Sequence, residues 1–135
     1  LIMLNSDMIK GVVLSLGKAD FHIERNENSG IGYRTRLRLN IRADSFVFLE
    51  EIQRGLHRMG IETTLKEKEH SSRPRPILRI GGIINLYKLM QGIPESCPDA
   101  KNEWARFRKA VEIVGERRHL TEEGITELFE LKGVL

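Results

Sequence analysis

The sequence has few of the residues that build covalent or metal-based frameworks. It contains one cysteine, Cys97, which excludes a disulfide framework. Its four histidines are scattered, and none has the spacing of a usual zinc site with the others or with Cys97: His22, His57, His70 and His119. We therefore expect an intracellular protein in a reducing compartment, such as the cytoplasm, the nucleoid or an organellar matrix.

Long apolar runs are also missing. The longest uncharged apolar stretch, from Gly11 to Gly17, is far too short to cross a membrane. No basic segment with a cleavage site precedes it, so we expect neither a secretory signal nor a membrane partner. Aromatic residues make up only 6% of the chain, which disfavours a stacking platform for single-stranded nucleic acid.

The chain is large enough for one compact domain, which we place at residues 1–135. It has 135 residues, of which 40% are hydrophobic, so a core can be buried. The net charge is only +3, but 14 of the 22 positive residues are arginines. Arginine is favoured over lysine where planar, bidentate contact with phosphate or guanine is needed.

The segment from Tyr33 to Arg42 alternates strictly between two kinds of side chain. Its apolar or small set is Tyr33, Thr35, Leu37, Leu39 and Ile41, and its polar set is Arg34, Arg36, Arg38, Asn40 and Arg42. A period of two sends these sets to opposite faces of a sheet. Four arginines are therefore predicted to stand side by side on one surface.

The remaining patterns predict an α+β fold in the order αββαββα, followed by more helix. The expected helices run from Asn5 or Ser6 to Gly17, from Asp44 or Ser45 to Gly60, from Ile83 to Gln91, from near Pro98 onward, and from a cap at Thr121. The other expected strands are 18–24, Ile61–Lys68 and Arg75–Ile80. One four-stranded antiparallel sheet with helices on a single face fits this order best.

The uncovered face of such a sheet would be basic. Its cationic and amide residues are Lys18, His22, Arg34, Arg36, Arg38, Asn40, Arg42, Lys66, Lys68, Arg75 and Arg79, against the acids Asp20, Glu24 and Glu62. Ten strand residues span about 33 Å, close to the roughly 34 Å of one DNA turn. We expect this face to bind double-stranded DNA; a peptide, an acidic protein or a membrane surface are the alternatives.

Three stretches resemble the LAGLIDADG homing endonuclease family. They are Ile9–Gly17 leading into a strand, Glu103–Phe107, and His119–Ile125 with Leu131–Lys132 beyond it, which is similar to the family's "HLT-x-x-G-L" ending. The resemblance covers essentially the whole chain and implies a LAGLIDADG-type fold with a basic, concave open face. Because the chain holds a single motif, it implies a homodimer whose first helices pack through Gly11, Val12, Ser15 and Leu16.

The resemblance also implies a catalytic centre, from which this sequence departs. Family members place an acidic residue before the last glycine of the motif, where it holds Mg²⁺. If that glycine is Gly17, the acidic position is Leu16; in a shifted register of the motif, Asp20 takes the acidic position instead. The family's basic residue after the fourth strand falls on Ile84, whereas Asn40 lies where a polar residue positions water.

These departures leave three functions open. The first is sequence-specific duplex binding by a homodimer whose nuclease activity is weak or lost. The second is an active Mg²⁺-dependent endonuclease with Asp20 as catalytic residue and metal ligand and Asn40 beside it. The third is an intron-splicing maturase or regulator derived from this scaffold, with RNA as a partner.

Overall fold

The computed structural model describes residues 4–134 and has an α+β architecture. Its helices are α1 (Ser6–Leu16), α2 (Phe46–Arg58), α3 (Ile83–Gly92), α4 (Trp104–Gly115) and α5 (Glu122–Lys132), with a short 3₁₀ helix at Arg118–Leu120. Its strands are β1 (Gly17–Arg25), β2 (Tyr33–Arg42), β3 (Thr64–Lys66) and β4 (Ile77–Gly81). The predicted order αββαββα with additional C-terminal helices is confirmed.

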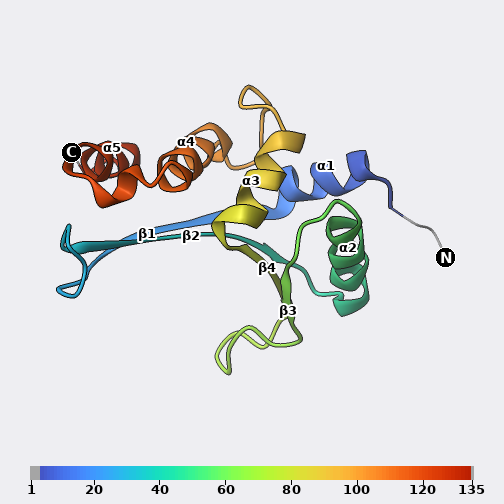
Figure 1. Ribbon diagram of the computed structural model, residues 1–135. Helices are drawn as coiled ribbons and strands as arrows, with labels where there is room; N and C mark the ends of the chain where they lie inside the picture. Colours follow the sequence, from blue (N-terminus) through green and yellow to red (C-terminus); the bar gives the residue numbers. More distant parts are fainter. Residues whose placement is uncertain (1–3, 135) are drawn as a thin grey trace.

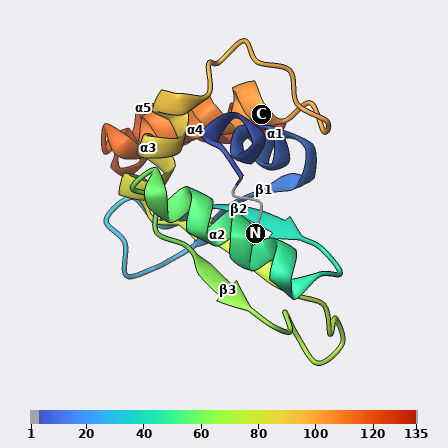
Figure 2. The same ribbon diagram turned by 90° about the vertical axis from the view of Figure 1, so that its right-hand side faces the viewer.

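The strands form one antiparallel sheet in the order β1-β2-β4-β3. β1 pairs with β2 along its whole length, from Gly17 opposite Ile41 to Arg25 opposite Tyr33. The helices lie on one side of the sheet, and the other side is uncovered and concave between the two hairpins (Figure 1). Figure 2 shows α2 lying along β3 and β4, while α1, α4 and α5 lie together over the other half.

The hydrophobic core lies between the sheet and the helices. β2 contributes Leu37, Leu39 and Ile41, all buried, and α1 contributes Ile9 and Val13. The helices begin where short polar side chains cap them, since the side chains of Asn5, Ser45 and Thr121 accept hydrogen bonds from the first-turn amides of α1, α2 and α5. These caps agree with the sequence-based helix starts.

The C-terminal helix fixes the β1–β2 hairpin from the helix side. Phe129 of α5 packs edge-on against Tyr33 of β2, with ring centroids 5.1 Å apart. Lys132 donates a hydrogen bond to the backbone oxygen of Phe21 and lies 5.1 Å from the centre of its ring. These contacts join the last helix to the first strand, so the α5 segment takes part in holding the sheet in position.

Three predicted boundaries are wrong. β3 covers only Thr64–Lys66, instead of Ile61–Lys68, and β4 begins at Ile77, because Pro74 and Pro76 provide no ladder donors. α4 begins at Trp104 rather than near Pro98, since Asp99 accepts hydrogen bonds from the amides of Glu103 and Trp104 and so caps the helix there.

One residue of the basic face is not exposed. Ile77 lies on this face among charged residues, but it is only 1% exposed. It is paired in the sheet with Arg42 on one side and Lys66 on the other. The apolar stems of long charged side chains can cover such a residue while their charged ends stay in water.

Within residues 4–134, we find no helix with the length and apolar character that crossing a membrane requires.

Candidate nucleic-acid interface

The register of the strands brings the predicted basic residues onto the uncovered face. The cross-strand pairs there are Lys18 with Asn40, Asp20 with Arg38, His22 with Arg36, Glu24 with Arg34, Asn40 with Arg79, and Arg79 with Thr64. Lys66 and Arg42 flank Ile77 in the same way. Lys68 and Arg75 were expected in strands, but they lie in the exposed β3–β4 loop.

Arg34, Arg38 and Arg79 form the part of this face whose positive charge is not neutralised. Among residues 4–134, no carboxylate oxygen lies within 4.0 Å of their guanidinium nitrogens. Partial burial, followed by the positive charges of Arg36 and Arg79, lowers the pKa of Arg38 from its usual value. The guanidinium remains charged at neutral pH, so these like charges repel one another until an anion approaches.

Asn40 orients one of these arginines. Its side-chain oxygen accepts a hydrogen bond of 3.0 Å from Nε of Arg79 on the neighbouring strand. Asn40 is only 5% exposed, so its own contact with a large ligand is restricted, whereas Arg79 is half-buried with its other nitrogens available. The sequence predicted Asn40 on this face but not its pairing with Arg79.

Asp20 is engaged by its basic neighbours. One of its carboxylate oxygens lies 3.0 Å from Nε2 of His22 and 3.6 Å from a guanidinium nitrogen of Arg36. Arg36 also lies 3.6 Å from Glu24. Arg36 is therefore partly neutralised, while Asp20 sits inside β1 on the basic face, beyond the end of α1.

Arg42 is held by a carboxylate that the sequence analysis missed. Its Nε and one terminal nitrogen donate hydrogen bonds of 2.6 and 2.8 Å to the two oxygens of Glu69. This bidentate contact raises the pKa of Arg42 and lowers that of Glu69. Because the two residues are 27 positions apart, no local pattern indicated the pair. It ties the β3–β4 loop to β2 and neutralises the end of the arginine row.

The junction of α1 with β1 carries no carboxylate of its own. α1 ends at Leu16, and Gly17 follows with its amide bonded to the oxygen of Val13. A side chain at Gly17 would clash with that oxygen, because its Cβ would lie only 2.3 Å away. The nearest acid along β1 is Asp20. Glu103, which precedes α4, also approaches, but its carboxylate accepts a hydrogen bond of 3.2 Å from the amide of Ala19.

The donor set for a metal ion is correspondingly poor. In the part of the chain that the structure describes, no three side chains of His, Cys, Asp or Glu come together as a metal site. Ile84, at the position where the family resemblance implies a basic residue, is a highly exposed side chain on α3. Residues 4–134 thus supply neither a cluster of three such ligands nor a basic side chain at residue 84.

The outer face of α1 is unusually apolar for an exposed surface. Met8 and Leu16 are 49% and 40% exposed, Gly11 and Ser15 are exposed, and Val12 is half-buried. A Cβ at Gly11 would meet nothing within 4 Å, so this glycine is not required by packing inside the chain. The four residues predicted for helix–helix contact thus lie together near solvent.

Replacing Glu69 with glutamine tests the Arg42 contact. Because Arg42 lowers the pKa of Glu69, the pair stabilises the fold above the usual glutamate pKa of about 4.3. That contribution is lost as the pH falls through the lower folded-state pKa. We expect Glu69→Gln to lower the free energy of unfolding by about 1 kcal/mol at neutral pH, and to have almost no effect in strong acid.

Denaturant unfolding at pH 7 and below pH 3 measures both values. Glu67→Gln is the matched control, since Glu67 is an exposed carboxylate of the same loop and its loss should leave stability unchanged. Equal losses for Glu69→Gln at both pH values would contradict the assignment.

Solved structures share this architecture, although sequence comparisons find no match. No protein-family model matches the sequence, and no curated protein matches it. Among solved structures, the homing endonuclease I-TnaI is 22% identical with a TM-score of 0.80, covering 96% of this chain and 86% of that chain. The archaeal intron-encoded homing endonuclease I-Vdi141I, complexed with DNA, is 20% identical with a TM-score of 0.78, covering 93% and 77%.

A third structure is longer than this chain. The LAGLIDADG homing endonuclease I-SmaMI, bound to cleaved DNA, is 19% identical with a TM-score of 0.80. The match covers 96% of this chain but only 43% of I-SmaMI, so this chain spans less than half the length of that protein. These likenesses show that the chain has the fold of the LAGLIDADG homing endonucleases.

Proposed function

We propose that this protein binds duplex DNA as a homodimer through the uncovered face of its sheet, and that its capacity for DNA cleavage is weak or lost. The observation that carries the proposal is the row of arginines on β2 and β4. Arg34, Arg38 and Arg79 lie on a concave surface that no helix covers, and no carboxylate of residues 4–134 neutralises them.

Duplex DNA matches this surface in charge and in length. Phosphates relieve the repulsion between neighbouring guanidinium groups and release counterions when they are bound. β2 has ten residues, which span about 33 Å, close to one helical turn of DNA. Arginine and asparagine side chains can also read guanine and adenine in the major groove. The DNA-bound state of I-SmaMI and I-Vdi141I supports the same partner.

A second copy of the chain supplies the other half of the binding surface. The outer face of α1 offers Met8, Val12 and Leu16 for apolar contact, and Gly11 and Ser15 allow two helix backbones to approach closely. Two such helices packed about a two-fold axis would bury these residues and set two basic faces side by side. A dimer of this kind favours a roughly palindromic site.

Cleavage is disfavoured by the chemistry at the helix junction. Mg²⁺ ions in such a site would supply a hydroxide nucleophile and stabilise the leaving oxygen. The end of α1 presents Leu16 rather than an acid, and Asp20 is held by His22 and Arg36. Loss of one group that stabilises the transition state typically lowers the cleavage rate by two or more powers of ten. DNA binding through the arginines does not depend on such a group.

Binding by the arginine row predicts a specific pattern of losses. Arg38→Ala should weaken duplex binding by about 1–3 kcal/mol, and unequally across sequences, if the side chain reads a base. Fluorescence anisotropy over a series of salt concentrations should also show log affinity falling by about 0.9 per phosphate contact. Arg54→Ala on the exposed surface of α2 is the control and should bind like the parent protein. A flat salt response would refute this interface.

The dimer is tested through α1. Leu16→Glu should convert the dimer to a folded monomer and weaken duplex binding strongly, because a charge on the helix–helix contact would be desolvated. Sedimentation and circular dichroism measure assembly and folding. Val47→Glu on α2 is the control, since Val47 is also exposed and lies away from α1. A Leu16→Glu protein that stays dimeric would contradict this interface.

The rival activities are separated by one cleavage experiment. We expect no double-strand breaks when a plasmid library of candidate sites is incubated with the protein and Mg²⁺. Breaks that vanish in Asp20→Asn would overturn the loss of activity and assign Asp20 to catalysis.

A competition experiment tests the maturase-like function. If structured RNA competes equally with duplex DNA at the same salt concentration, that function is favoured instead.

A further inference from the structure

The sheet has a free edge in its middle. β4 pairs with β2 only along Arg38–Arg42, and its last residue, Gly81, lies opposite Arg38. β2 continues from Arg38 back to Tyr33 with β1 on one side only. Within residues 4–134, no hydrogen bond from another segment reaches the backbone of Arg34–Leu37 on the open side. Alternate amides and carbonyls of this stretch are therefore unpaired, as in any edge strand.

A groove runs along this free edge. Its volume is about 490 Å³, and five consecutive residues of β2, Arg34–Arg38, line one side of it. The opposite side is formed by Thr63, which precedes β3, by Thr64, the first residue of β3, and by the start of α3. A run of consecutive residues means that the groove follows the backbone edge, with side chains from both faces of the sheet at its borders.

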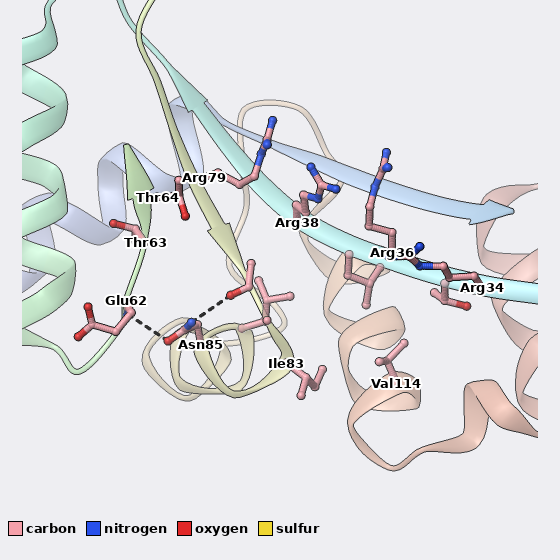
Figure 3. A pocket seen from close by; sticks show the side chains of 15 residues that line it. Arg34, Arg36, Arg38, Glu62, Thr63, Thr64, Arg79, Ile83, Asn85 and Val114 are labelled. Carbon is pink, nitrogen blue, oxygen red and sulfur yellow. Dashed lines mark hydrogen bonds between the residues drawn. The ribbon is translucent and has the colours of Figure 1, made fainter. Parts of the chain in front are cut away.

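The two borders of the groove differ in chemistry. Figure 3 shows Arg36, Arg38 and Arg79 pointing to the side of the sheet that faces away from α3. Ile83 of α3 and Val114 of α4 line the other side, and Leu86 of α3 also lines the groove. An extended segment in the groove would thus meet guanidinium groups with every second side chain and apolar groups with the side chains between them.

Buried polar atoms in the groove also lack partners. The hydroxyl oxygens of Thr35 and Thr63 and Nε of Arg36 are buried, and the structure shows no hydrogen-bond partner for them among residues 4–134. Buried polar atoms normally have a partner. All three belong to residues that line the groove, so its walls contain polar groups without partners.

We propose that the free edge of β2 binds an extended segment of an acidic partner protein, which adds a strand to the sheet between β2 and the β3–α3 wall. Its acidic side chains alternate with apolar or β-branched ones. The acidic set lies against Arg34, Arg36 and Arg38, which are spaced about 7 Å apart along β2, and the apolar set lies against Ile83, Leu86 and Val114. Backbone hydrogen bonds give affinity, and the alternation gives specificity.

A polypeptide fits this edge better than a nucleic acid does. Duplex DNA approaches the concave face from outside the plane of the sheet, whereas the unpaired groups of β2 lie within that plane, where a strand at about 4.8 Å would pair with them. Glu62 at the far end of the groove forms a hydrogen bond of 2.8 Å with Nδ1 of His57. This binding does not require the proposed DNA function, but the shared arginines make the two ligands competitors.

The test uses a synthetic seven-residue peptide in which glutamate and valine alternate. Its termini are blocked, so that only the glutamate side chains are charged. A scrambled peptide of the same composition is the matched control. Fluorescence anisotropy without DNA should show at least ten-fold tighter binding of the alternating peptide. Equal binding of the two peptides, or no binding of either, would overturn the proposal, since charge alone would not distinguish them.

Two further measurements locate the peptide. Two peptides are methylated on alternate sets of backbone nitrogens. Methylation of the set that faces β2 should abolish binding, and methylation of the other set should leave binding intact. Amide hydrogen exchange of Arg34–Leu37 should slow at least ten-fold at alternate residues in the complex. Unchanged exchange there, or the same protection produced by a short DNA duplex, would overturn strand addition. Peptide and duplex should compete for the protein, because they share the arginines. This competition is measured apart from peptide binding, so the peptide results test the β2 edge even if the protein binds no DNA.

Discussion

The two-residue period of β2 is the constraint on which the structure depends. Leu37, Leu39 and Ile41 are buried beneath the helices, while the arginines between them lie on the opposite face. A slip of one residue in the pairing would exchange the two sets and bury four guanidinium groups. Only one face of the sheet is apolar enough to hold helices, so the same alternation that forms the core leaves the other face uncovered.

Crowding of positive charge on that face is limited by the placement of its acids. Glu69 neutralises Arg42 at one end, and Asp20 and Glu24 partly neutralise Arg36. Arg38 lies between these pairs with the charges of Arg36 and Arg79 close by. The acids thus reduce the positive charge at Arg36 and Arg42, while Arg34, Arg38 and Arg79 keep a field of the sign that attracts polyanions.

Local patterns predicted most elements and the basic face, but not its internal pairings. β2 is confirmed from Tyr33 to Arg42 because strict alternation fixes both its length and its faces. β3 and the start of β4 were predicted too long, since β4 begins only after Pro74 and Pro76, and β3 pairs with it over three residues. That contact, and the hydrogen bond of Asn40 with Arg79, join residues 27 and 39 positions apart. Such distances carry no periodic signal in one sequence.

Binding and cleavage depend on this fold in different ways. In the proposed complex, the binding free energy would come from several side chains on the sheet, so the loss of any one would leave most of it in place. The proposed loss of cleavage rests on one backbone position, the end of α1, where this chain has Leu16. Under that proposal, a single substitution at the junction would remove catalysis while the surface persists. The free edge of β2 adds a second demand on the same arginines, because a strand bound there would neutralise them from within the sheet plane.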